Sequence, residues 1–294
     1  MQAARDLEGR TFLVTGASAG IGRATVCALA ARGGSVVLAC RSEEKTQPVL
    51  EEIRRLHQAS SARADVEFLP IDLGDLASVK RAADTFLASS RPLDVLINNA
   101  GIAGATGLSK DGYEIVFATN HLGPFLLTKL LLPKLLEAPQ GRVVNVASRA
   151  HFRARTIDWG QMSQPVKKIH GYPHYGATKL MNILHAKELA NRLAGTRVTT
   201  YSLHPGVVAS ELWREIPWPV ANVMKLFFTS NEEGAKTTLY CATAPELSSS
   251  SGLYYDGCKE ARVSRLARDE CLAREVFERS EDAIRTLLPA ASAA

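Results

Sequence analysis

The sequence has few cysteines, no glycosylation sequon and no long hydrophobic run near its start. Its five cysteines are odd in number and lack a short-range framework, which favours free thiols in a reducing compartment. No Asn-x-Ser/Thr occurs, and no apolar stretch long enough for a secretory signal or a membrane span precedes the first expected strand. These absences predict a cytoplasmic protein without a transmembrane span.

The sequence also lacks a concentrated block of charge. Lys and Arg together number 35 and Asp and Glu number 30, which gives a formal net charge of +5, and the basic residues are dispersed. Because there is no basic stripe, a nucleic-acid partner is not expected, and the small excess favours an anionic ligand only weakly. No metal site is expected either, because His170 and His174 are four residues apart but Pro173 lies between them.

Strand-like and helix-like segments alternate along the first two-thirds of the chain. The expected strands occupy 11–15, 35–40, 66–71, 93–97, 142–146, 197–203 and 252–255. The expected helices occupy 21–32, 43–58, 76–87, 113–136, 173–193, 232–242 and 264–288, the fourth with a break near Gly123 and Pro124. This order predicts a single α/β domain over 1–294, with a doubly wound, mostly parallel sheet and helices on both faces. Residues 1–9 are expected to form an N-terminal extension and 289–294 a frayed tail.

A glycine-rich turn, TGASAGIG at 15–22, follows the first expected strand and opens the first helix. Its glycines are Gly16, Gly20 and Gly22, and glycine lets the backbone approach a ligand closely. A helix N-terminus offers free N–H groups to a phosphate. The spacing is longer than G-x-G-x-x-G, so the alternative of a plain strand-to-helix turn stays open.

The end of the second strand indicates which dinucleotide is preferred. An acidic residue there suits the ribose hydroxyl of NAD, whereas arginine suits the 2′-phosphate of NADP. This strand ends at Cys40 and is followed by Arg41 and Ser42, while Glu43 and Glu44 come later, as first-turn helix residues. The order favours NADP(H); the alternative is an exposed loop arginine without a ligand.

Tyr175 and Lys179 are four residues apart in an expected helix, so they lie on one face. An ammonium beside a phenol favours the phenolate, and such a pair can exchange a proton with a substrate oxygen near neutral pH. Tyr255 and Lys259 have the same spacing, but Gly257 between them argues against a helix there. Spacing alone therefore does not identify the pair.

The motifs in their order along the chain resemble the short-chain dehydrogenase/reductase family. The resemblance rests on TGASAGIG at 15–22, Asp72, NNAG at 98–101, Asn120, Ser148, Tyr175-x-x-x-Lys179 and HPG at 204–206. It implies a Rossmann-type fold and an oxidoreductase that interconverts an alcohol and a carbonyl with a nicotinamide cofactor. The implied catalytic residues are Asn120, Ser148, Tyr175 and Lys179.

The resemblance also implies which residues meet the cofactor and the substrate. The implied cofactor residues are Gly16, Ser18, Gly20, Ile21, Gly22, Arg41, Ser42, Asp72, Leu73, Asn98, Ala100, Gly101, Tyr175, Lys179, Pro205, Gly206, Val208 and Ser210. Among them, Asp72 would contact the adenine and Val208 the nicotinamide amide, while Asn98 with Gly101 would shape the ribose region. The implied substrate residues are Ser148, Tyr175 and Trp213.

Finer details resemble the retinol dehydrogenase-like branch of the family. They are LACRS at 38–42, NHLGPFLLTKLLLP at 120–133, RVVNVASRAH at 142–151 and the 27 positions from Ser148 to Tyr175. This branch implies a lipophilic substrate resembling a retinoid, a steroid or a xenobiotic. The sequence departs from many members in lacking an N-terminal membrane anchor, which admits a soluble reductase of other lipophilic carbonyls.

Residues 207–230 are expected to form the substrate lid. Within them, Ile216–Phe228 is rich in aromatic residues and proline, and it fits a lid, ordinary core packing or peripheral membrane contact. A homodimer through 125–136 and 175–193 is a further expectation. The functional alternative is a nucleotide-sensing binding protein of the same fold, which would not need Ser148, Tyr175 and Lys179 together.

Overall fold

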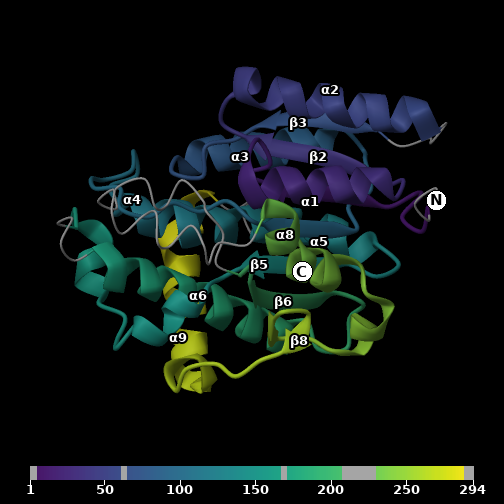
Figure 1. Ribbon diagram of the computed structural model, residues 1–294. Coiled ribbons are helices and arrows are strands. Elements are labelled where there is room, and N and C mark those ends of the chain that lie inside the picture. Colours follow the sequence, from purple (N-terminus) through teal and green to yellow (C-terminus); the bar gives the residue numbers. More distant parts are fainter. Residues whose placement is uncertain (1–4, 61–64, 167–170, 207–229, 288–294) are drawn as a thin grey trace, which may run out of the picture.

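One eight-stranded sheet runs through the protein, in the order β3-β2-β1-β4-β5-β6-β7-β8 (Figure 1). The computed structural model describes residues 5–60, 65–166, 171–206 and 230–287. The strands are β1 Thr11–Thr15, β2 Ser35–Cys40, β3 Val66–Pro70, β4 Val95–Asn98, β5 Arg142–Val146, β6 Thr199–His204, β7 Leu253–Asp256 and β8 Lys259–Glu260. Neighbouring strands pair in parallel from β3 through β7, and only β8 is antiparallel.

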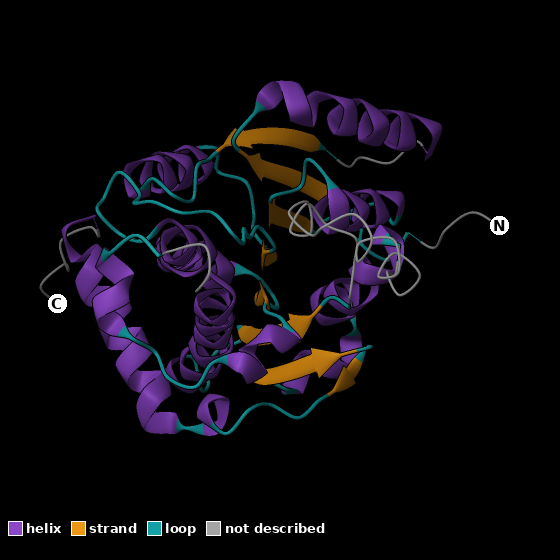
Figure 2. Cartoon of the chain, turned by 60° about the vertical axis from the view of Figure 1, so that its left-hand side comes forward, coloured by secondary structure: helices purple, strands orange, loops and turns teal. Residues whose placement is uncertain are grey.

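Helices cover both faces of the sheet (Figure 2). One face packs against α1 Gly20–Ala31, α2 Glu43–Ser60 and α8 Asn231–Thr243. The other packs against α3 Leu76–Ala88, α5 Gly123–Glu137 and α6 Gly171–Arg192, with α9 Glu270–Ile284 outside α5 and α6. Strands β1, β4, β5 and β6 are buried at every residue, because each has a helical layer on both sides. The predicted single-domain, doubly wound α/β fold is confirmed.

The expected helix over 113–136 is continuous but irregular. It consists of α4 Ile115–Phe117, a π-helical turn at Ala118–Leu122 and then α5. The predicted break near Gly123 and Pro124 is therefore wrong, because the Gly123 N–H still donates to the Ala118 carbonyl oxygen and the π-helical turn leads into α5 without interruption. A side chain at Gly123 would lie 2.3 Å from the Leu73 carbonyl oxygen, so glycine lets this helix approach the loop after β3.

The same stretch, Ile115–Glu137, is long and apolar enough to cross a membrane by length and composition. In the described part of the chain it is the one helix that passes this test, and 78% of its most apolar window is buried inside the protein. Its apolar character is explained by its place in the core of the α3–α5–α6 layer.

The expected helix over 264–288 is wrong at its start. A short 3-10 turn at Leu266–Arg268 comes first, and Asp269 then caps α9 by accepting a hydrogen bond from the Leu272 N–H. The second Tyr-Lys pair lies in a β-hairpin and not in a helix, as Gly257 indicated. Tyr255 lies in β7, Lys259 begins β8, and a two-residue turn joins the strands.

The N-terminal extension is partly attached to the fold. Of the predicted segment 1–9, the described residues 5–9 lie against the end of α1. The Leu7 N–H donates to the Arg32 carbonyl oxygen at 3.2 Å, and the Leu7 side chain is buried. Asp6 also forms an ion pair with Arg32.

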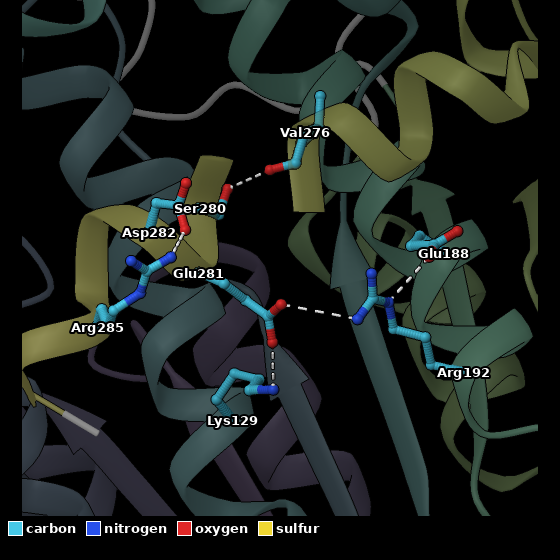
Figure 3. A network of polar contacts seen from close by, with 8 residues as sticks. All are labelled: Lys129, Glu188, Arg192, Val276, Ser280, Glu281, Asp282 and Arg285. Carbon is cyan, nitrogen blue, oxygen red and sulfur yellow. Dashed lines mark hydrogen bonds and ion pairs between the residues drawn. The ribbon is translucent and has the colours of Figure 1, made fainter. Parts of the chain in front are cut away.

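Helix α9 ties α5 to α6 through a charged network (Figure 3). Glu281 contacts the Lys129 ammonium of α5 at 2.6 Å and the Arg192 guanidinium of α6 at 3.6 Å. Beneath this network Phe277 is buried, and the Arg192 guanidinium lies 4.0 Å from its ring centroid. The surfaces of α5 and α6 under α9 are therefore covered by the chain itself, and the homodimer through these helices stays a prediction.

We expect Phe277→Ala to lower the free energy of unfolding by about 3–5 kcal/mol, because it leaves a cavity between three helices. Denaturant unfolding measures this loss. Glu278→Ala, the exposed neighbour on the same helix, serves as the control and should change stability by less than about 0.5 kcal/mol. Equal effects of the two substitutions would show that α9 is not packed in this way.

Candidate active site

The turn between β1 and α1 leaves a helix N-terminus open. No side chain caps the first turn of α1, and no acidic residue lies in it. A side chain at Gly22 would lie 2.2 Å from the Gly16 carbonyl oxygen, and Gly16 has a φ of +68°, so both positions require glycine. The backbone N–H groups can therefore approach a phosphate closely. The predicted cofactor residues of this turn are Gly16, Ser18, Gly20, Ile21 and Gly22.

Residues that sequence reasoning missed fasten this turn to the end of β4. The Thr15 hydroxyl oxygen accepts hydrogen bonds from the N–H groups of Asn99 and Ala100, both at 3.0 Å. The Asn99 amide donates in return to the Thr15 carbonyl oxygen at 2.9 Å. The second asparagine of NNAG was the available signal, and its role is to hold the two loops together.

The end of β2 has the arrangement that the sequence predicts. Arg41 is exposed and forms no ion pair with any described residue. The Ser42 hydroxyl accepts a hydrogen bond from the Lys45 N–H at 3.2 Å, so it braces the start of α2. Glu43 and Glu44 lie in the first turn of that helix. The strand end therefore has an exposed guanidinium beside a serine, and the preference for NADP(H) stays a prediction.

Asp72 and Leu73 form the turn after β3. The Asp72 carboxylate accepts a hydrogen bond from the Gly74 N–H at 2.9 Å, and Leu73 is buried. The cap of the next helix is Asp75, which accepts from the Ser78 N–H at 3.0 Å. Asp72 is half-buried, and its contact with a cofactor stays a prediction.

Asn98 points into the protein. Its side chain is buried and donates to the Thr128 hydroxyl at 3.0 Å and to the Asn145 amide oxygen at 2.9 Å. It therefore holds β4 to β5 and to α5. Asn98 lies at the carboxyl end of β4, and its predicted contribution to the ribose site stays a prediction.

Tyr175 and Lys179 lie together on α6, both buried. The Lys179 ammonium lies 5.6 Å from the centroid of the Tyr175 ring and donates to the carbonyl oxygen of Val146, the last residue of β5, at 2.9 Å. It forms no ion pair with a described residue. Burial lowers the pKa of Lys179 to about 8, because the charged form loses its hydration.

Asn120 lies in the π-helical turn, next to this ammonium. Its amide accepts from the Ile102 N–H at 2.7 Å and donates to the Ile102 carbonyl oxygen at 2.9 Å. It also donates to the Thr178 hydroxyl on α6 at 3.2 Å. A side chain on Gly101 would lie 3.1 Å from the Lys179 ammonium and 3.5 Å from the Asn120 amide oxygen, so both groups flank this glycine.

Ser148 begins the turn after β5. Its hydroxyl oxygen accepts from the Ala150 N–H at 3.1 Å, which leaves the hydroxyl hydrogen free to donate. The turn lies close against α6, since a side chain on Gly176 would be 2.7 Å from the Ala150 carbonyl oxygen. The buried His151 ring bonds the Ser148 carbonyl oxygen at 2.7 Å and fixes the turn.

The HPG motif ends β6 beside the same turn. His204 is buried, its Nδ1 accepts from the Arg149 N–H at 3.4 Å, and burial lowers the pKa of its ring to about 4. Pro205 and Gly206 follow it and are half-buried. The predicted residues Val208, Ser210 and Trp213, with the segment Ile216–Phe228, lie outside the described residues.

Four polar groups therefore lie near the carboxyl ends of β4, β5 and β6. They are the Tyr175 phenol, the Lys179 ammonium, the Ser148 hydroxyl and the Asn120 amide. These are the groups that proton transfer to a substrate oxygen requires. In the described ranges no three His, Cys, Asp or Glu residues are grouped as metal ligands would be.

Comparisons with known proteins find similar sequences and structures over most of the chain. A family model described as short chain dehydrogenase matches residues 10–219. The chain is 41% identical to human dehydrogenase/reductase SDR family member 13 over 285 residues, which cover 94% of this chain and 73% of that protein. It is 42% identical to human retinol dehydrogenase 11 over 280 residues, covering 94% and 86%. A solved structure of an uncharacterized protein from Mycobacterium paratuberculosis matches with a TM-score of 0.76 at 32% identity, covering 96% and 97%.

The buried ammonium predicts a pH dependence of stability. Below about pH 8, Lys179 is charged in both the folded and the unfolded state, and its burial opposes folding. Its pKa is about 8 in the folded protein and 10.5 in the unfolded chain, so between these values only the unfolded chain holds the proton. The free energy of unfolding therefore rises with pH across this window, by up to about 3 kcal/mol. Urea unfolding of the protein and of Lys179→Met, from about pH 7 to pH 10, measures the rise as the difference between the two.

Taking this difference removes the other groups that titrate in the same range, because both proteins contain them. A difference that stays constant with pH would contradict the lowered pKa of Lys179.

Proposed function

The chain belongs to the short-chain dehydrogenase family, and we propose that it interconverts an alcohol and a carbonyl on a lipophilic substrate with NADP(H) as its cofactor. Family membership makes it an oxidoreductase with a nicotinamide cofactor. The observation that carries the proposed chemistry is the position of the Lys179 ammonium between the Tyr175 ring and the carboxyl end of β5. A protein that only binds a nucleotide does not need this group in a buried place.

Each residue of the site would have a separate role in the reaction. A nicotinamide held at this site would supply the hydride chemistry at the substrate carbon. The Tyr175 phenol gives a proton to the carbonyl oxygen in reduction and accepts it from the alcohol in oxidation. Lys179 favours the phenolate by its charge, and the free hydrogen of the Ser148 hydroxyl donates to the substrate oxygen and stabilises charge on it. Asn120 holds the Ile102 backbone beside Lys179.

The preference for NADP(H) rests on the end of β2. Arg41 is exposed with no ion pair among the described residues, and Ser42 lies beside it. A guanidinium binds a phosphate with two parallel hydrogen bonds, whereas the described end of β2, Cys40 to Ser42, has no acidic residue to accept a bond from a ribose hydroxyl. The phosphate turn, with Asp72, Leu73, Ala100, Gly101, Pro205 and Gly206, would hold the rest of the dinucleotide.

The substrate class comes from the relatives. Several similar proteins are named retinol dehydrogenases, and from them we infer that the substrate is a bulky lipophilic alcohol or carbonyl resembling a retinoid, steroid or xenobiotic. The protein would work in the cytoplasm, either free or in contact with a membrane surface, with residues 207–230 as the lid over the substrate. The second candidate, a nucleotide-sensing binding protein, is favoured only by the phosphate turn.

We expect the protein to consume NADPH with a panel of lipophilic aldehydes and ketones, and Tyr175→Phe to lower kcat by about 10²- to 10⁴-fold. The substitution removes the proton donor and keeps the ring, so the Kd for NADPH should change little. Absorbance of the reduced cofactor measures turnover, and fluorescence titration measures binding.

Tyr255→Phe is the matched control, because Tyr255 has the same spacing to a lysine but lies in β7. Its kcat should match that of the unchanged protein. Tight NADPH binding without turnover on any carbonyl would support the binding protein instead, and near-normal turnover of Tyr175→Phe would reject the proposed mechanism.

Arg41→Ala should weaken NADPH binding by about 10- to 100-fold, the value of one or two charge-assisted hydrogen bonds, and leave NADH binding unchanged. Arg55→Ala, an exposed arginine of α2 paired with Glu51, should affect neither cofactor. A protein that binds NADH more tightly than NADPH before any substitution would overturn the preference.

A further inference from the structure

A buried acid–base pair lies one residue before Tyr175. The His174 ring nitrogen Nε2 is 2.6 Å from the Glu114 carboxylate, and both side chains are almost fully buried, with 3% and 0% of their surface exposed. A carboxylate only accepts hydrogen bonds, so Nε2 donates. No step of the proposed reaction uses this pair, and a buried carboxylate is costly unless hydrogen bonds compensate for its lost hydration.

Glu114 joins three segments that are far apart in sequence. Its carboxylate oxygen Oε2 accepts from the Phe117 N–H at 2.8 Å and so caps the helix that leads into the π-helical turn. Its own N–H donates to the Met162 carbonyl oxygen at 2.8 Å, in the segment between Ser148 and Tyr175. Through His174 it reaches the first turn of α6. The second oxygen, Oε1, is buried and has no hydrogen-bond partner in the described part of the chain.

These contacts fix the elements that carry the proton-transfer set. The capped helix leads to Asn120 six residues later, and the first turn of α6 leads directly to Tyr175. Asn120 and α6 are joined again by the bond from the Asn120 amide to the Thr178 hydroxyl. The pair therefore makes a second connection between the two helices, on the other side of Tyr175 along α6.

We propose that Glu114 and His174 are positioning residues, which set where the Tyr175 phenol stands relative to Asn120 and Lys179. This inference rests on the proposed function for its effect on turnover, but the positioning itself can be measured without turnover. A displacement of about 1 Å at a reacting group can cost a hundredfold in rate, so the start of α6 is a place where a fixed contact matters to the chemistry.

The test uses four variants of the full chain: His174→Ala, His174→Gln, Glu114→Gln, and Glu114→Gln combined with His174→Ala. His174→Ala should lower kcat about 10- to 100-fold with little change in the KM for NADPH. His174→Gln places an amide donor where Nε2 stands and should recover most of the rate. Glu114→Gln alone keeps an acceptor for the Phe117 N–H and should lower kcat less than His174→Ala.

The double variant separates positioning from simple stability. His174→Ala leaves a buried carboxylate without its partner, which lowers Tm, and Glu114→Gln removes that unpaired charge. If the pair positions Tyr175, Tm of the double variant recovers toward that of the unchanged protein while kcat stays low. If kcat recovers together with Tm, the pair contributes only to stability and the inference is overturned.

Hydrogen exchange provides the readout that does not depend on turnover. In the cofactor-free protein, amides at the start of α6, from 174 to 180, should exchange faster in His174→Ala and in the double variant, and at the normal rate in His174→Gln. Unchanged exchange in His174→Ala would overturn the inference. If the unchanged protein turns over no carbonyl, the proposed function fails, and the exchange data still decide whether the pair holds the helix.

Discussion

The burial of the Lys179 ammonium constrains the position of the strands and helices around it. An ammonium leaves water at a high cost unless its donors are satisfied, and here no described carboxylate is beside it. The Val146 carbonyl oxygen and the face of the Tyr175 ring take the place of a carboxylate, and a pKa of about 8 reflects what remains of the cost. For these contacts to form, α6 must lie directly against the end of β5. This close approach explains why glycine occupies positions 101 and 176, where a side chain would be crowded.

A buried polar network lies beneath the site and holds the same elements in register. Asn98 and Asn145 pair across β4 and β5, and Asn145 continues to the His185 ring on α6 at 3.3 Å. His185 and His121 are both buried, and burial lowers their pKa values to about 3 and about 4, so both rings are neutral at physiological pH. A network of neutral groups can sit inside the helical layer without a buried charge, and its hydrogen bonds specify one relative position of strand and helix.

The parts of this architecture that were predictable depend on local sequence. Buried strands appear as short apolar runs, and the phosphate turn, NNAG and the Tyr175–Lys179 spacing are each contained within a few residues. The π-helical turn around Asn120 was not predictable, because it depends on how the helix meets Ile102 and Leu73. For the same reason the Glu114–His174 contact was missed: its partners are sixty positions apart, and His174 was considered only as a candidate metal ligand.

The support for the site comes from within one chain, and α9 provides its outer layer. The His121 ring, which follows Asn120 directly, bonds the Ser280 hydroxyl of α9 at 2.8 Å. Phe277 packs against Phe125 of α5, with ring centroids 4.9 Å apart, and against the Arg192 guanidinium of α6. Both helices that carry the proton-transfer set are therefore braced from the side away from the sheet by the same helix. The contacts of His121 and Phe277 with α9 therefore hold the reacting groups in position from within the chain.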